Sequence, residues 1–319
     1  MLTPAGTAEG LSLNVFADGF TNRGDGLGPI GVGFPSTGGP LVSVEGGSGN
    51  PSIVYQFPNY NLGQHTSGAT TSTIYAGDNS VGGIASVGSQ LYMAQASQNQ
   101  VIKLNNNGSP GTVVWPAPGN PVALVTDTLT GHLFVSVYLD GIWDFNPGTG
   151  TAMELSTQNV DGLTFDPAHN VLYGATADAT RVIGLDATTG TQVFDSGFIP
   201  GRPDGTALGF GSLAGKLFAN TNGGTVVQVD LSTLAQTTIA DNGSRGDLVA
   251  VDSLGRLYLT QTDSVWRLEG PAGGGFGPQP IPEPSTLTLV GIGLAGLSAC
   301  VWQQRRKKRL PCLLNAGKL

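Results

Sequence analysis

The sequence has few of the residues on which catalysis, metal binding or nucleic-acid binding commonly depends. Its two cysteines, Cys300 and Cys312, lie near the C-terminus, so no disulfide is expected in the body of the chain. The histidines His65, His132 and His169 share no metal-ligand spacing. No G-x-S-x-G, P-loop or H-E-x-x-H motif is present, which argues against the common hydrolase, nucleotide-binding and zinc-protease classes.

Basic residues are also scarce before the C-terminal segment. Eight Lys and Arg residues against 21 Asp and Glu residues precede residue 283, a formal net charge of −13. Such an acidic body repels nucleic acid and anionic lipid, so neither is an expected partner. The charge suits either a solvated extracellular surface or cation binding and does not distinguish them.

A sustained helical period is absent before residue 285, and short β-type segments recur instead. Residues 160–198 contain four such segments separated by turns rich in Asp, Asn, Pro and Gly. Their second segment has counterparts along the chain, anchored at Leu41, Leu91, Leu133, Leu172, Leu217 and Leu257. A period of roughly 40–45 residues with four strands per unit is typical of a β-propeller blade. The sequence therefore predicts an all-β six-bladed β-propeller over residues 11–270.

The last repeat ends before it has an outer strand. Residues 14–20, NVFADGF, resemble residues 192–198, QVFDSGF, which form the predicted outer strand of the fourth repeat. We therefore expect residues 11–20 to complete the last blade and close the ring, which removes two exposed strand edges. The alternative is an independent or frayed N-terminal strand.

The remaining segments are assigned by composition. Residues 1–10 are a leader remnant without a signal peptide, and residues 271–281 form a flexible Gly/Pro linker. Residues 287–302 are uncharged and mainly apolar, and predict a single transmembrane helix of about 24 Å, slightly short of a ~30 Å hydrocarbon core. Residues 310–319 form a C-terminal extension.

The C-terminal region resembles the PEP-CTERM sorting signal of Gram-negative bacteria. The resemblance covers residues 282–309 and includes a tripeptide, an apolar Gly-rich segment and a basic cluster, in that order. The matching residues are Pro282, Glu283, Pro284, Arg305, Arg306, Lys307, Lys308 and Arg309. The basic cluster is expected to stay on the cytoplasmic side of the membrane.

This resemblance implies a route of export and a cellular location. It implies export, transient anchoring in the inner membrane, and recognition and cleavage near residues 282–284 by an exosortase. It also implies a final location at the cell surface or in the extracellular matrix of a bacterium that makes exopolysaccharide. Members of the family carry an N-terminal signal peptide, so we expect the true start to lie upstream of Met1. They usually end just after the basic cluster, whereas ten residues follow it here.

Three aspartates occupy the entrance to the first strand in successive repeats. Asp161, Asp204 and Asp247 are expected to converge at one mouth of the central channel, with Asn120 as a neutral oxygen ligand, and Ca²⁺ is the cofactor that such a set would bind. At the level of the fold this arrangement resembles calcium-dependent lactonases of the gluconolactonase kind and NHL propellers. The alternative, which the pattern favours, is turn chemistry between blades. Members of the lactonase families also use an early glutamate, and the only nearby candidate, Glu45, lies at a second strand.

The sequence favours a non-catalytic binding or interaction module, with exopolysaccharide or surface proteins as candidate partners. The alternative is a calcium-dependent, lactonase-like hydrolase with its site at the channel mouth. Fold alone does not decide between them, because propellers carry many unrelated functions.

Overall fold

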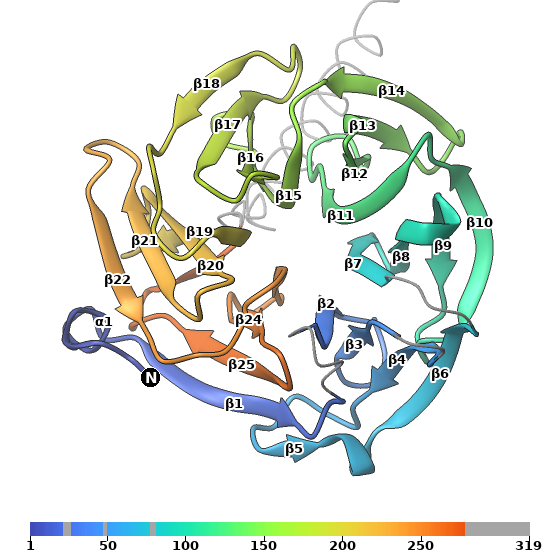
Figure 1. The fold of residues 1–319 in the computed structure, drawn as a ribbon, viewed down its shortest axis with the longest axis horizontal. Helices are drawn as coiled ribbons and strands as arrows, with labels where there is room; N and C mark the ends of the chain where they lie inside the picture. Colours follow the sequence, from blue (N-terminus) through green and yellow to red (C-terminus); the bar gives the residue numbers. More distant parts are fainter. Residues whose placement is uncertain (22–26, 47–49, 77–80, 278–319) are drawn as a thin grey trace, which may run out of the picture. The chain divides into compact units, whose positions relative to one another are not determined.

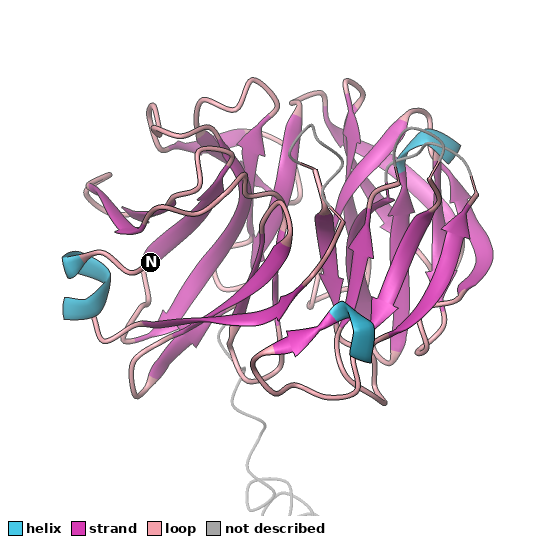
Figure 2. Cartoon of the chain, turned by 60° about the horizontal axis from the view of Figure 1, so that its bottom comes forward, coloured by secondary structure: helices cyan, strands magenta, loops and turns pink. Residues whose placement is uncertain are grey.

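Six mainly antiparallel sheets surround a central axis in the computed structural model, which describes residues 1–21, 27–46, 50–76 and 81–277 (Figure 1). In five of the sheets a four-stranded meander runs from the innermost strand outward, and the sixth takes an outer strand from the N-terminal residues. Seen from the side, the strands cross the thickness of the ring and the loops lie on its two faces (Figure 2). The predicted all-β six-bladed β-propeller is confirmed.

The blades follow one another along the chain, and each of the first five contains a four-stranded meander, which in blade one is interrupted by β5 (Gln64–His65). Blade one contains β2 (Pro29–Gly33), β3 (Leu41–Val44), β4 (Ser52–Gln56) and β6 (Thr70–Tyr75). Blade two contains β7 (Val81–Val87), β8 (Gln90–Gln95), β9 (Gln100–Leu104) and β10 (Pro110–Pro116). Blade three contains β11 (Asn120–Thr126), β12 (Leu133–Tyr138), β13 (Gly141–Asn146) and β14 (Thr151–Ser156).

The second half of the ring repeats this arrangement. Blade four contains β15 (Val160–Asp166), β16 (Val171–Thr176), β17 (Val182–Asp186) and β18 (Gln192–Asp195). Blade five contains β19 (Pro203–Gly211), β20 (Lys216–Thr221), β21 (Val226–Asp230) and β22 (Gln236–Ala240). Blade six contains β23 (Val249–Val251), β24 (Leu257–Thr260), β25 (Ser264–Glu269) and β1 (Ser12–Asp18), and β5 (Gln64–His65) pairs parallel with β1 at its edge.

The N-terminal strand closes the ring. β1 pairs antiparallel with β25, in a register that runs from Ser12 opposite Glu269 to Asp18 opposite Ser264. Its Phe16 side chain is fully buried, and its ring centroid lies 5.4 Å from that of Phe57 and 5.1 Å from that of Tyr258. These contacts join the last blade to blade one. The predicted closure is confirmed, and the alternative of a frayed or independent strand is excluded.

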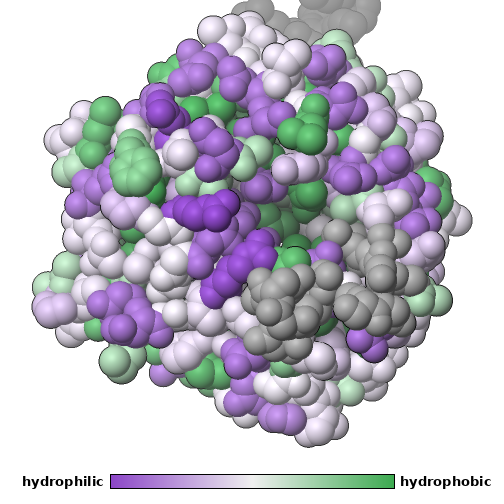
Figure 3. All heavy atoms as spheres, viewed as in Figure 1, coloured by the Kyte–Doolittle hydropathy of each residue, from purple (hydrophilic) through white to green (hydrophobic). Residues whose placement is uncertain are grey.

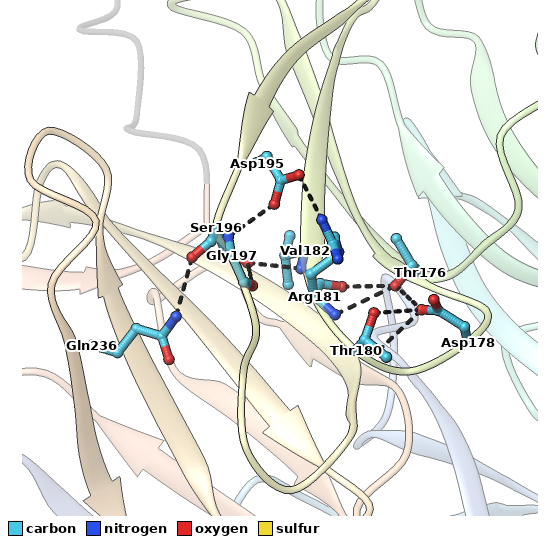
Figure 4. Close-up of polar contacts among 9 residues, drawn as sticks. All are labelled: Thr176, Asp178, Thr180, Arg181, Val182, Asp195, Ser196, Gly197 and Gln236. Atoms are coloured by element: carbon cyan, nitrogen blue, oxygen red, sulfur yellow. Dashed lines mark hydrogen bonds and ion pairs between the residues drawn. The ribbon is translucent and has the colours of Figure 1, made fainter.

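The hydrophobic core lies between neighbouring blades. One cluster joins Tyr92 and Val101 of blade two to Val135 and Phe145 of blade three. Polar contacts add to these interfaces near the rim, where the Gln236 amide of β22 donates to the Ser196 carbonyl oxygen that follows β18, at 3.1 Å (Figure 4). Each blade thus buries its faces against its neighbours, which explains why the sheet has to be repeated.

Residues 1–10, predicted as a leader remnant, are ordered and pack against blade five. They include a short helix, α1 (Pro4–Ala8), which contacts β22. The Thr3 N–H donates to the Ile239 carbonyl oxygen at 3.0 Å, and Gly6 is buried so tightly that a Cβ atom there would lie 2.3 Å from the same oxygen. The small residues that suggested a leader permit this close docking.

The segment predicted as a flexible linker is also partly ordered, and the prediction is wrong for residues 271–277. β26 (Gly274–Phe276) pairs antiparallel with the end of β19 and adds a fifth strand to blade five. Phe276 is 1% exposed, and its ring centroid lies 4.9 Å from that of Phe218. Burial of this one aromatic ring offsets the conformational freedom of the glycines around it.

The chain divides into two compact units, residues 1–279 and residues 280–319. Across the described ranges, which end at residue 277, no helix is both long enough and apolar enough to span a membrane. The predicted transmembrane segment, residues 287–302, and the extension, residues 310–319, lie outside the described residues.

Candidate functional site

The three predicted aspartates lie side by side at the same end of successive inner strands. The first ladder pairs, Val160 with Thr176 and Pro203 with Thr221, place Asp161 and Asp204 at equivalent positions. A glycine follows both Asp161 and Asp204, whereas Leu248 follows Asp247. A Cβ atom on Gly162 would lie 2.4 Å from the Asp204 carbonyl oxygen, and one on Gly205 would lie 2.6 Å from that of Asp247. These two glycines therefore allow the backbones of adjacent inner strands to lie in direct contact, which a side chain at either position would prevent.

An arginine and an asparagine connect two of these carboxylates. The Arg245 Nη2 atom lies 3.3 Å from the Asp247 Oδ2 atom, and its Nε–H donates to the Asn222 Oδ1 atom at 2.6 Å. The Asn222 amide in turn donates to the Asp204 Oδ2 atom at 3.1 Å. The backbone N–H of Asn222 is held by the Arg202 carbonyl oxygen at 2.9 Å. The result is one continuous polar network across blades five and six.

Burial disfavours the ionised form of these three carboxyl groups and so raises their pKa values. It raises the pKa of Asp161 to about 7, with a further rise from the Asp204 charge, and the Arg245 charge opposes the shift. Burial also raises the pKa of Asp204 to about 6, against the opposing effects of Arg245 and the Asn222 hydrogen bond. Burial also raises the pKa of Asp247 well above its usual range. The charges of Asp204 and Asp161 raise it further, and the Arg245 charge opposes the shift. Carboxyl groups perturbed in this way are typical of functional sites, although structural ion networks show them too.

These shifts predict that the protein loses stability as the pH rises from about 4 to about 7. The folded state holds protons on the aspartates more tightly than the unfolded chain does, so ionisation in this window lowers the free energy of unfolding. We expect a decrease of about 1–3 kcal/mol between pH 5 and pH 7.5, measured by urea denaturation. The Asp161→Asn/Asp204→Asn variant should show a flatter profile and exceed the unsubstituted protein in stability at pH 7.5. An equal decrease in both proteins would contradict this assignment.

An open recess adjoins the network at this face. It has a volume of about 460 Å³ and is lined by Gly201, Arg202, Asn222, Gly223 and Arg245. The space-filling view shows a hollow at the centre of the ring, with strongly hydrophilic side chains beside it and hydrophobic surface within it (Figure 3). Among the described residues, none pairs with the Arg202 guanidinium, which leaves its donors available to a ligand.

Asn120 does not belong to this group, contrary to the prediction. Asn120 pairs with Tyr138 and Pro121 pairs with Val137, so Pro121 is equivalent to Pro203, and Val122 occupies the position of Asp204. Asn120 corresponds to Arg202 instead. The proline at the start of the strand, Pro121 in blade three and Pro203 in blade five, gives the register, and the polar Asn120 lies one residue before it.

The arrangement does not fit the Ca²⁺ ion that the lactonase resemblance implies. Throughout the described ranges, no group of three or more His, Cys, Asp or Glu side chains is placed to hold a metal ion. The positive charge beside the carboxylates comes from Arg245, which is already bonded to Asp247 and Asn222. A metal role for Asp161, Asp204 and Asp247 stays a prediction, and no catalytic step is derived through it.

Sequence reasoning missed Arg202, Asn222 and Arg245. Two of them carried a signal, because an arginine stands two residues before the aspartate in both blade five and blade six. Asn222 lies in the turn between β20 and β21 and reaches the mouth only through the folding of its blade. No spacing in the sequence marks it.

The comparison with protein families concerns the C-terminal region. Residues 280–306 match the model described as the PEP-CTERM protein-sorting motif. The chain carries a PEP-CTERM sorting signal. The PEP-CTERM match includes Pro282, Glu283, Pro284, Arg305 and Arg306, so the predicted resemblance is confirmed. These residues lie outside the described part of the structure, and their individual roles, with those of Lys307, Lys308 and Arg309, stay predictions.

The signal indicates export and sorting to the cell surface, and it implies recognition by an exosortase. The curated proteins include none with significant sequence similarity to this chain. The family match therefore indicates the cellular location of the protein. It does not indicate an activity for the propeller.

Solved structures share the fold of the body. A gluconolactonase from Xanthomonas campestris is 16% identical, with a TM-score of 0.63 over 85% of this chain and 94% of its own. A putative oxidoreductase (glucose dehydrogenase) from Thermus thermophilus is 18% identical, with a TM-score of 0.61 over 81% of this chain and 99% of its own. A streptogramin B lyase is 12% identical, with a TM-score of 0.53 over 82% and 98%. At such identities the similarity concerns the fold alone.

Proposed function

We propose that this protein is an exosortase-sorted binding module of the cell surface or extracellular matrix, and that its ligand-binding face is the polar mouth of the propeller. The PEP-CTERM match at residues 280–306 is the observation that carries the proposal. A surface address gives the propeller access to polymers and proteins outside the cell. The open recess at Arg202, Asn222 and Arg245 supplies a place to bind them.

Sorting would proceed through a temporary membrane anchor. Residues 287–302 would hold the chain in the inner membrane, with the basic residues 305–309 on the cytoplasmic side. Cleavage near residues 282–284 would then release the propeller to the surface. The described ring is complete before that point, because β26, which ends at Phe276, is its last strand.

The chemistry of the mouth suits a hydroxyl-rich ligand such as a neutral saccharide. Sugar hydroxyl groups both donate and accept hydrogen bonds, and the recess offers guanidinium donors, an amide and carboxyl oxygens within one network. The net charge of −13 on the preceding part of the chain disfavours polyanions at long range. Exopolysaccharide with neutral repeating units is therefore the proposed partner, with surface proteins as the other class.

Binding to the exopolysaccharide of the producing bacterium tests this proposal. Arg202→Gln should weaken binding roughly 10- to 100-fold, since hydrogen bonds from a charged donor contribute about 1.5–3 kcal/mol. Arg181→Gln is the matched control, because that arginine pairs with Asp195 within blade four, away from the recess. The measurement is calorimetry or a sedimentation assay with the purified polysaccharide. Equal binding by all three proteins would contradict a role for the mouth.

A calcium-dependent, lactonase-like hydrolase is the alternative. Three adjacent aspartates with raised pKa values favour it, and one protein of similar fold is named a gluconolactonase. The position of Arg245 opposes it. A hydrolysis screen against lactones with added Ca²⁺ separates the two functions. Turnover that Asp204→Ala abolishes would replace the binding proposal with the enzymatic one.

A further inference from the structure

The described chain ends at the end of the channel opposite the polar mouth. Asp161 and Asp204 are the second residues of their inner strands, whereas Gly277 lies beside the last residue of another inner strand. A Cβ atom on Gly277 would lie 3.0 Å from a methyl carbon of Val251, which ends β23, and the Gly277 N–H donates to the Leu208 carbonyl oxygen at 2.7 Å. Gly277 is therefore held close to the channel, at the face away from the recess.

An open apolar cavity lies at this end of the channel. It has a volume of about 180 Å³, and Gly277 and all six inner strands contribute to its wall. The turns that follow the inner strands lie around it, and we call the surface that they form the exit face. These turns are residues 34–40, 88–89, 127–132, 167–170, 212–215 and 252–256.

Two turns of the exit face present leucine side chains to solvent. Leu129 in blade three is 55% exposed, and Leu254 in blade six is 71% exposed. Their N–H groups donate to the Oδ1 atoms of Asp127 and Asp252, at 2.8 Å and 3.0 Å. Both of these carboxylates are buried, so the tips of the two turns carry apolar and not charged side chains. The two leucines stand on the face from which the chain continues toward the sorting signal.

The connection from the propeller to the apolar segment is short. Gly277 and residue 287, where that segment begins, are ten residues apart, and a chain of this length spans at most about 36 Å. A path around the rim needs about 14 Å across the four strands of a blade and about 20 Å along a six-residue outer strand such as β14. The connection would be fully extended on reaching the edge of the opposite face. An anchored chain therefore keeps the polar mouth away from the bilayer.

We propose that the exit face lies against the bilayer surface while the protein is anchored, with Leu129 and Leu254 in the headgroup region, and that the polar mouth faces outward. The inference rests on the proposed function, because it needs the anchor formed by residues 287–302. The surface concerned is a zwitterionic bilayer, since the net charge of −13 before residue 283 opposes anionic lipid. The recess at Arg202 and Arg245 also stays open to ligand after cleavage near residues 282–284, because the remaining tail begins at the exit face.

Fluorescence quenching by lipid tests which face is near the bilayer. Residues 1–299 contain no cysteine, so the Cys300→Ser/Cys312→Ser chain with one introduced cysteine carries a single bimane label. Leu254→Cys labels the exit face. Leu139→Cys, in the turn after β12, labels the other face and is the matched control, because the two side chains are 71% and 72% exposed. In phosphatidylcholine vesicles with headgroup spin-labelled lipid, quenching should be about 3-fold stronger at residue 254, since a strand length of about 20 Å separates the faces.

A second pair of variants repeats the comparison. Leu129→Cys labels the exit face and Tyr138→Cys labels the other face, and this pair decides if a variant of the first pair does not fold. Equal quenching at the two faces, or stronger quenching at residues 138 and 139, in chains that float with the vesicles would overturn the orientation and leave the proposed function intact. A chain that does not float with the vesicles would contradict the proposed anchor, and the orientation with it.

Discussion

Phe16→Ala is expected to lower the free energy of unfolding by about 3–5 kcal/mol, the usual cost of removing a fully buried aromatic side chain. The effect should be this large because Phe16 is 0% exposed and stands on the strand that closes the ring. Its ring contacts Phe57 of blade one and Tyr258 of blade six in edge-to-face geometry. Truncation therefore weakens the one interface that joins the two ends of the propeller.

Phe198→Ala is the matched control for this prediction. It removes the same atoms from a side chain that is 68% exposed, between blades four and five, and should change stability by less than about 0.5 kcal/mol. Urea denaturation of both variants and the unsubstituted protein gives the comparison. Similar small effects of the two substitutions would show that β1 does not hold the ring closed.

Replacement of Pro282, Glu283 and Pro284 by alanine is expected to abolish delivery to the cell surface. The tripeptide lies within the matched sorting motif and belongs to the second compact unit, residues 280–319. A signal of this kind is read by a receptor, so its loss should leave the exported chain uncleaved in the inner membrane. Cell fractionation in a host that contains an exosortase measures the outcome.

Leu310→Ala/Pro311→Ala is the control for the sorting prediction, because both residues follow the matched motif. This variant should be sorted normally, and deletion of the exosortase should reproduce the defect of the tripeptide variant. Normal surface delivery of the tripeptide variant would mean that the match has no sorting role in this chain.

The repeat and its closure were predictable because they rest on local signals. A turn followed by an apolar segment recurs every 39 to 50 residues, and each copy needs a neighbour to bury its faces. The similarity of residues 14–20 to an outer strand of blade four was sufficient to place the N-terminus in blade six. Strand composition and period thus determine most of the ring.

The parts that were missed depend on contacts between distant segments. Residues 271–277 have linker composition, and their strand depends on pairing with β19 and on the contact between the Phe276 and Phe218 rings. Arg245 and Asn222 meet the aspartates across two blades, which no spacing within one repeat reveals. The apolar cavity requires all six inner strands at once. Sequence periodicity predicts the blades, whereas the chemistry of the channel is a property of the assembled ring.

The mature C-terminus of the surface-located protein tests the central claim most directly. Mass spectrometry of the protein recovered from the cell surface should find peptides from the propeller through Phe276 and a chain end near residues 282–284. Peptides from the basic cluster at residues 305–309 should be confined to the membrane fraction. Surface protein that still carries its C-terminal residues through Leu319 would contradict an exosortase-sorted propeller.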